Sequence, residues 1–299
     1  MMNLRQFRQG VALCAGFILM TTAGAQTTAS TPAAKSAKAP AKKAASPAYK
    51  PVIEAKAMGL LKEMSEKIAA AKSASFTATV GYEFPSKLGP PIAYTMRYDV
   101  AMQRPDKLKI VMPGDGPASE FYYNGKTIMA YAPAENLVAI TDAPPTIDGA
   151  LATAYKAAAI YFPFTDLLVA DPYKALTEGT VLAFYIGSSS VIGSVKTEML
   201  AWANKDVFLQ VWIGAEDKLP RRVRAVFAAD RWQFRHEMEL SNWKLDLAHP
   251  AETFTSQKAL AAPRIGLKSP TVPAPTGIKP LVKMPAANAP ATKPQPKSP

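Results

Sequence analysis

The sequence predicts an α+β fold in which one large, curved, antiparallel β-sheet of about eleven strands holds helices on its concave side. Three observations lead to this prediction. A long amphipathic helix opens the body of the chain, stretches with a two-residue period lie on both sides of a helical insert, and close turns join consecutive stretches. Close turns make consecutive strands antiparallel neighbours.

Residues 52–72 form the predicted first helix. Charged residues occupy one face, no proline interrupts the segment, and the internal Gly59 is a small cost. The apolar residues recur at steps of three and four, namely at Ile53, Ala57, Leu60, Leu61, Met64 and Ile68. This spacing predicts a helix that buries one side.

From residue 75 onward the period changes to two, which is typical of strands. Asn124-Gly125 predicts a type I′ hairpin turn, because both central positions of that turn need a positive φ. The predicted strands of this half are 76–82, 92–100, 107–112, 120–123, 127–131 and one more after the turn at 133–136. They should follow one another in the sheet.

The insert, residues 146–179, is predicted to be helical. Thr146 can cap a helix that runs through Lys156, and residues 163–169 form a second short helix. Asp171 caps a third, with Pro172 at its first position, which stops at Gly179. Strands are then predicted at 181–186, 195–202, 207–213, 222–227 and 232–245.

The start of the chain has the pattern of a secretory signal peptide. Arg5 and Arg8 precede an apolar run over residues 11–20, and cleavage is expected after Ala25. The run is shorter than the ~20 residues that span a bilayer. We therefore predict an exported, soluble protein in four parts: a Sec-type signal peptide 1–25, a disordered Ala/Lys/Pro linker 26–50, a folded domain 51–262 and a disordered Pro/Lys-rich tail 263–299.

Charge placement argues against nucleic acid as a partner. Residues 51–262 hold all 23 acidic residues and 22 of the 35 basic ones, so the net charge of +12 comes from the two ends. A nucleic-acid reader needs its positive charge on a folded face. The ends could instead contact an anionic envelope surface, or act as solubilising spacers. We expect a monomer.

Few residues suggest catalysis or metal binding. The single cysteine, Cys14, lies in the signal peptide, and the two histidines have no second ligand nearby in sequence. His236 is interpreted as a solvated strand residue. Ser188-Ser189-Ser190 lacks the turn of a nucleophile elbow. We therefore predict no catalytic residue, no metal and no cofactor.

Ordered motifs give the chain a resemblance to a known family. Residues 104–108 (RPDKL), 121–127 (FYYNGKT) and 131–133 (YAP) resemble a progression found in Lol-type carriers of outer-membrane lipoproteins. The closer resemblance is to a predicted-periplasmic domain-of-unknown-function family of that superfamily. Its signposts are TIDGAL (146–151), LLVADPY (167–173), VWI (211–213), LPRR (219–222) and LSNW (240–243). The resemblance covers roughly residues 57–255.

What the resemblance implies is an unclosed half-barrel whose helical lid encloses an apolar cavity. In Lol-type carriers the arginine of the RP motif, here Arg104, helps to hold the lid. Many members of the nearer family carry a Cys-x-His pair after a glycine; residues 193–198 here have neither, so any thiol or metal role is absent. The predicted ligand-binding residues are Arg104, Tyr98, Tyr123, Trp212, Phe162, Phe164 and Leu168.

The function that follows is a hypothesis with two alternatives. The first is a non-enzymatic periplasmic carrier of an acyl chain or lipoprotein. The second is an envelope adaptor with a filled core that works through its basic tails. The third is a periplasmic hydrolase whose catalytic pair is assembled from distant residues.

Overall fold

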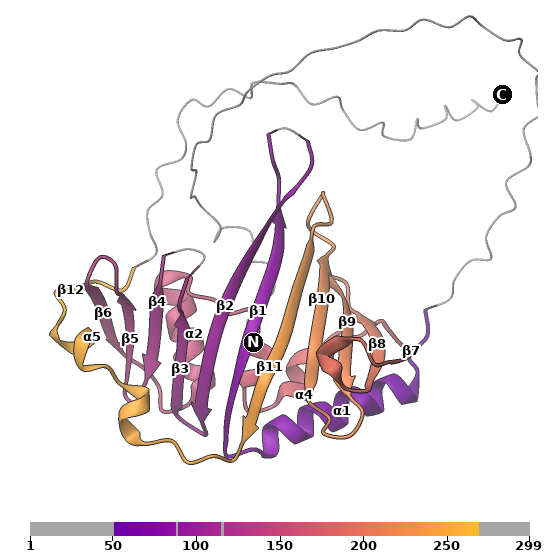
Figure 1. Ribbon diagram of the computed structural model, residues 1–299, viewed down its shortest axis with the longest axis horizontal. Helices are drawn as coiled ribbons and strands as arrows, with labels where there is room; N and C mark the ends of the chain where they lie inside the picture. Colours follow the sequence, from indigo (N-terminus) through magenta and orange to yellow (C-terminus); the bar gives the residue numbers. More distant parts are fainter. Residues whose placement is uncertain (1–50, 88, 115–116, 269–299) are drawn as a thin grey trace, which may run out of the picture.

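The computed structural model describes residues 51–87, 89–114 and 117–268. The predicted signal peptide, the linker 26–50 and residues 269–299 of the predicted tail lie outside the described residues. The described chain forms a single unclosed sheet of twelve strands with a few helices, which confirms the α+β prediction. Figure 1 shows the strands fanned side by side, with the first helix beneath them.

Neighbouring strands of the sheet are consecutive in the chain except at two places, where β12 lies beside β6 and β1 beside β11. Its order is β12-β6-β5-β4-β3-β2-β1-β11-β10-β9-β8-β7, and every pair is antiparallel except β12 with β6. The strands are β1 (Ser73–Phe84), β2 (Ile92–Gln103), β3 (Lys107–Met112), β4 (Ser119–Tyr123), β5 (Thr127–Ala132), β6 (Leu137–Asp142), β7 (Leu182–Ser189), β8 (Thr197–Ala203), β9 (Val207–Gly214), β10 (Pro220–Phe227), β11 (Arg235–Leu245) and β12 (Arg264–Ile265). The two halves meet where β1 pairs with β11, for example Val80 opposite Met238.

Helix α1 (Ala55–Ala70) buries the apolar stripe that predicted it, including Leu61, Met64 and Ile68, except for Ile53, which precedes the helix and is exposed. It is shorter than the predicted 52–72 because the residues before it pair with β7. The Ala183 N–H donates to the Val52 carbonyl at 2.9 Å, and the Glu54 N–H donates to the Ala183 carbonyl at 2.8 Å. Backbone that completes a sheet edge cannot also continue a helix.

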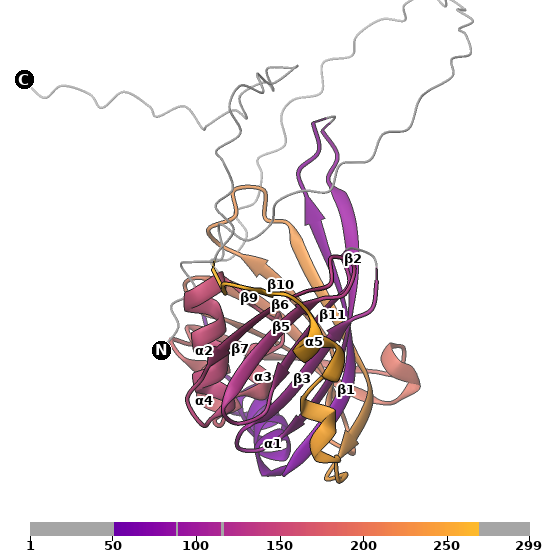
Figure 2. The same cartoon turned by 90° about the vertical axis from the view of Figure 1, so that its left-hand side faces the viewer.

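The insert forms α2 (Ile147–Ala158), α3 (Thr165–Leu168) and α4 (Pro172–Thr177). The Thr146 hydroxyl accepts from the Gly149 N–H at 3.0 Å, and the Asp171 carboxylate accepts from the Lys174 N–H at 2.9 Å. Both predicted caps are therefore present. Together with α1 these helices pack against one face of the sheet, which we call the inner face; Figure 2 shows it from the side.

A smaller core lies on the opposite, outer face. Helix α5 (Gln257–Ala261) follows the 3₁₀ turn Ala251–Phe254, and its Ala259 is buried with Tyr122, Met129, Tyr131 and Val138. The chain then adds β12 beside β6. This two-residue strand, just beyond the predicted end of the domain at residue 262, is the reason for twelve strands where the sequence predicts about eleven.

Candidate ligand-binding site

The centre of the inner face is an aromatic cluster built from both the sheet and the insert. Phe164 lies edge-on to Tyr98, with ring centroids 5.3 Å apart, and edge-on to Phe76 at 5.5 Å. Phe162 stacks on Phe164 at 5.9 Å and meets Phe121 at 5.3 Å. Such pairs add roughly 0.5–1.5 kcal/mol each beyond simple burial. They fix the insert against the sheet.

Arg104 ties the insert to the end of β2. Its Nη1 donates to the carbonyl oxygens of Leu168 at 3.1 Å and Val169 at 3.0 Å, which are the end of α3 and the residue after it. Its Nε and Nη2 are buried and have no hydrogen-bond partner in the described part of the chain. Burial lowers the pKa of the Arg104 guanidinium, and the Asp148 carboxylate partly opposes this.

Neighbouring backbone contacts complete the attachment. The Arg104 N–H donates to the Lys72 carbonyl at 2.8 Å, just after α1, and the Ile147 N–H donates to the Pro105 carbonyl at 2.9 Å. The Tyr123 hydroxyl donates to the Pro144 carbonyl, ahead of α2. The turn after β2 therefore contacts the residue that follows the first helix, the start of the insert and the end of α3.

Six of the seven predicted ligand-binding residues come together. Tyr98, Tyr123, Phe162, Phe164 and Leu168 belong to the inner core, and Arg104 bonds to Leu168. Burial raises the pKa of Tyr98 to about 12. The phenol therefore stays neutral at physiological pH.

Trp212 lies apart from the other six. Its neighbours Val211 and Ile213 are in the inner core, so by strand alternation Trp212 is on the outer face, where the Arg222 guanidinium carbon is 5.8 Å from its ring centroid. The two-residue period of the sequence places Trp212 opposite to its neighbours but does not say which side faces the core.

Side chains fill the space between the insert and the sheet. Phe164, Leu168 and Tyr123 are each 0–1% exposed. A pocket of about 460 Å³ opens instead on the outer face, beside Thr77, Asp99 and Lys244. Any ligand under the insert must therefore displace side chains or lift the insert.

A second part of the inner face, absent from the predicted site, lies where strands β1, β2, β10 and β11 extend past the helices (Figure 1). Tyr82 stacks with Tyr94 at 5.7 Å, and the His236 ring lies 6.4 Å from Tyr82 and 5.1 Å from Phe227. His236 is thus half-buried among aromatic rings, not solvated, and burial lowers its pKa. The sequence holds a signal for this arrangement, because Tyr82, Tyr94 and His236 each lie in a strand whose two-residue period predicts which residues share a face.

Neither a metal cluster nor a membrane-spanning helix is found in the described residues. No group of three His, Cys, Asp or Glu side chains there is placed to hold a metal ion. No helix there is long and apolar enough to cross a membrane.

The fold and this face define a class of protein: an open, curved sheet whose apolar inner face carries a helical insert. A family model described as "Predicted periplasmic protein (DUF2092)" matches residues 57–268, and the chain belongs to that family. This confirms the resemblance seen in the motifs, and the periplasmic location agrees with the predicted export signal. No curated protein matches the chain.

Several solved structures are similar over most of the described chain. A LolA superfamily protein from Nitrosomonas europaea is 12% identical, with 66% of this chain and 97% of that one covered and a TM-score of 0.31. A lipoprotein-sorting domain from Vibrio parahaemolyticus is 10% identical, with 67% and 96% covered and a TM-score of 0.33. The MucA/MucB complex of Pseudomonas aeruginosa is 13% identical, with 69% of this chain and 62% of that one covered and a TM-score of 0.39. Likeness at this level does not extend to function.

Proposed function

We propose that this periplasmic protein binds a hydrophobic ligand, namely an acyl chain or the acyl chains of a lipidated protein, on the inner face of its sheet, without catalysis. One observation carries the proposal. The inner face is apolar and aromatic along its length, but the helices cover only part of it, so that Phe84 and Tyr94 are 37% and 40% exposed. An uncovered apolar surface that continues a buried one favours a ligand that joins the two.

In this proposal the insert is a lid. The ligand enters beside Tyr82 and Tyr94 and extends under the insert as Phe162 and Phe164 move aside, with Tyr98, Tyr123 and Leu168 lining its path. Arg104 holds the lid through two carbonyls, and its unpartnered Nε and Nη2 are available to a carboxylate or ester oxygen of the ligand. Trp212 is left out because it lies on the outer face.

The energetics give a direct test. Each buried methylene contributes about 0.8 kcal/mol, so two more carbons in a saturated fatty acid should tighten binding by roughly tenfold. Titration of a fluorescent fatty acid, displaced by acids of increasing length, measures this dependence. Native mass spectrometry of protein purified from its own periplasm identifies the natural ligand. Affinity that does not change with chain length contradicts the proposal.

Arg104 gives the test of the lid. We expect Arg104→Leu to speed release of bound acyl probe to vesicles by about tenfold, because two charge-assisted hydrogen bonds to the lid are lost. Arg97→Leu is the matched control, because Arg97 is exposed on the outer face and pairs with Asp99. A folded Arg104→Leu protein that binds and releases like wild type rules out this role for Arg104.

The adaptor hypothesis is the alternative, because it assumes a filled core and side chains fill the space beneath the insert. A chain lacking residues 26–50 and 269–299 separates the two. Acyl binding should survive this deletion if the inner face is the site. Loss of an envelope association, with no acyl binding in either form, would favour an adaptor that works through its tails.

A further inference from the structure

Two hairpins project past the helices at one end of the sheet (Figures 1 and 2). Aromatic side chains are exposed at their ends. We call these the hairpin ends: Phe84, Ile92 and Tyr94 where β1 turns into β2, and Arg231, Trp232 and Phe234 where β10 turns into β11. Four aromatic side chains are strongly exposed in the described part of the chain, and three of them, Phe84, Tyr94 and Trp232, lie here. Trp232 is 43% exposed and Ile92 48%. Hairpin turns are ordinarily polar, so this concentration calls for a partner.

The exposed groups are held in place. The Asp230 carboxylate accepts from the backbone N–H groups of Trp232 at 3.0 Å and Phe234 at 2.9 Å. The Trp232 and Phe234 rings stack, with centroids 6.2 Å apart and planes 15° apart. The Arg231 guanidinium carbon lies 4.4 Å from the Trp232 ring centroid. Binding through these rings would therefore cost little ordering entropy.

The two hairpin ends form one surface. A pocket of about 280 Å³ lies between them, bounded by Pro85 and Pro91 on one side and by Trp232 and Phe234 on the other. The ion pair between Glu83 and Arg235 joins β1 to β11 at its base. Both hairpins therefore border one pocket, with two prolines on one side and two aromatic rings on the other.

The charges around this surface favour an anionic partner. Its basic residues are Lys87, Arg231 and Arg235, and its acidic residues are Glu83 and Asp230. Arg235 neutralises Glu83, and Asp230 is occupied by backbone N–H groups. Lys87 and Arg231 remain available to phosphates, beside exposed Trp, Tyr and Ile. This is the composition that suits the headgroup layer of a bilayer, where amphipathic rings lie among the headgroups and basic side chains reach the phosphates.

We propose that the hairpin ends dock the protein onto an anionic lipid bilayer, with Trp232, Phe84 and Ile92 in the headgroup layer and Lys87 and Arg231 on lipid phosphates. Docking needs no bound acyl ligand, so it stands independently of the proposed function. If both hold, the uncovered part of the inner face meets the bilayer, which gives a lipid chain a short route onto Tyr82 and Tyr94.

The first experiment is co-sedimentation of the full mature chain with vesicles of phosphatidylethanolamine and phosphatidylglycerol, at moderate and high salt. High salt suppresses purely electrostatic binding by the basic tails, while apolar insertion persists. We expect Trp232→Ala to weaken the salt-resistant partition by about tenfold. Leu247→Ala is the control, since Leu247 is 48% exposed at the opposite end of β11 and should change nothing. Equal binding by wild type and Trp232→Ala overturns the proposal.

A second measurement locates the β1–β2 hairpin end on the bilayer directly and keeps Trp232 in place. Cys14 is the only cysteine and lies in the predicted signal peptide, so Lys87→Cys gives a single labelling site in the mature chain. A polarity-sensitive dye there should shift to the blue on these vesicles, while the same dye at Lys62→Cys on α1 should not. An unshifted dye at residue 87, or a shift that only an added envelope protein produces, assigns the surface to something other than lipid. Arg104→Leu should dock normally, which separates this result from failure of acyl binding.

Discussion

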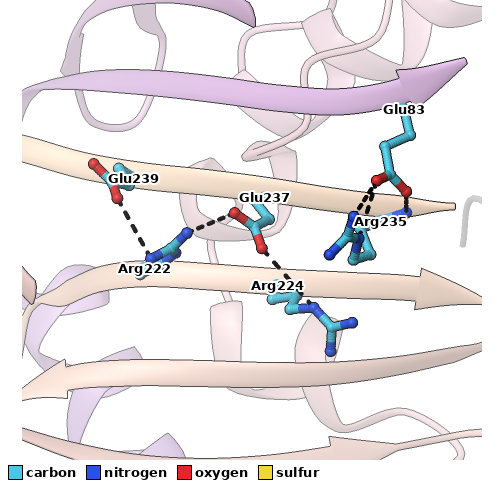
Figure 3. Close-up of polar contacts among 6 residues, drawn as sticks. All are labelled: Glu83, Arg222, Arg224, Arg235, Glu237 and Glu239. Carbon is cyan, nitrogen blue, oxygen red and sulfur yellow. Dashed lines mark hydrogen bonds and ion pairs between the residues drawn. The ribbon is translucent and has the colours of Figure 1, made fainter. Parts of the chain in front are cut away.

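The two faces of the four central strands, β2, β1, β11 and β10, are held by different forces. On the inner face Val80, Met238 and Leu240 are almost fully buried under the helices. On the outer face, charged residues of β1, β11 and β10 form a ladder of ion pairs (Figure 3). The same backbone thus carries a dry surface and a solvated one, one residue apart.

The ladder on the outer face is linked through Arg222. Its Nη2 donates to Glu237 at 2.5 Å, its Nη1 lies 3.7 Å from Glu239, and Glu237 also lies 3.9 Å from Arg224. Solvent-exposed ion pairs contribute little stability, whereas burial of apolar groups contributes kilocalories per side chain. The inner face therefore supplies the stability, and the outer face supplies solubility and a register in which opposite charges meet.

The largest effect on stability should follow from truncation of a buried side chain on the inner face. Phe164→Ala removes a fully buried ring that contacts Phe76 and Tyr98, so we expect a loss of about 3–5 kcal/mol in the free energy of unfolding. Urea denaturation measures this loss. Val191→Ala is the control, because Val191 is 82% exposed and its truncation should leave the free energy of unfolding almost unchanged. If the proposed function holds, added fatty acid should restore part of the lost stability by filling the space. A loss below 1 kcal/mol would mean that the insert does not depend on this ring.

The second effect is on the pH dependence of stability, which the carboxylates of Asp166 and Glu83 should change in opposite directions. Burial raises the pKa of Asp166, in α3, from 3.8 to about 6. The folded state then binds this proton more tightly than the unfolded state, so the ionised carboxylate destabilises the fold as pH rises from about 4 through 6. We expect Asp166→Asn to stabilise the protein by about 1–2 kcal/mol at pH 7 and to have no effect near pH 4.

Glu83 on the outer face should behave in the opposite sense. Hydrogen bonds from Arg235 lower the pKa of Glu83, so its contribution is present at neutral pH and disappears as pH falls through the lowered pKa. Unfolding of Asp166→Asn and Glu83→Gln across pH 3–7 therefore gives curves that diverge from wild type in opposite directions. Parallel curves would mean that burial does not control Asp166.

A smaller effect should come from the ladder itself. Arg222→Leu removes the cation shared by Glu237 and Glu239, and we expect a loss of about 1 kcal/mol or less, reduced by salt. Chemical denaturation at two ionic strengths measures it. A loss near that of Phe164→Ala would show that the outer face is as important as the inner one.

The smallest effect is expected at Arg97. Both partners of the Arg97–Asp99 pair are more than 40% exposed, so Arg97→Ala should change the free energy of unfolding by less than about 0.5 kcal/mol. Equilibrium unfolding of this variant and of the wild-type protein measures the change. A larger loss would point to the second partner of Asp99, the Thr77 hydroxyl that donates to it at 2.9 Å.

The turn, the helix caps and the apolar stripe could be predicted because each is caused by residues a few positions apart in the chain. Asn124 caps its own turn by accepting from the N–H groups of Lys126 and Thr127. The hairpin forms where the Asn-Gly pair predicts it, but only Gly125 adopts a positive φ, of +93°, so the turn is not the predicted type I′. The caps at Thr146 and Asp171 depend on neighbours three residues away. The apolar stripe of α1 lies within the helix that it predicts from Ala57 to Ile68, whereas Ile53 lies before the helix.

Features that depend on contacts between distant segments could not be predicted from the sequence in the same way. Alternation separates Trp212 from Val211 but gives no sign of which side meets the helices, so Trp212 was grouped with the ligand-binding residues. The edge pairing that shortens α1 joins Val52 to Ala183, and β12 pairs with β6 across the whole insert. Nothing in the local pattern of either segment specifies such a partner.

By itself, the amino-acid sequence determined the α+β class, the order of helices and strands, their turns and caps, and a family membership that the motifs signalled. Packing between distant segments is what pairs β1 with β11, places the insert over part of the inner face, and brings the ends of two hairpins to the border of one pocket. The reason is physical. Turns and periodicity are set by residues within a few positions of each other, whereas a face or a pocket exists only when segments far apart in the chain pack together.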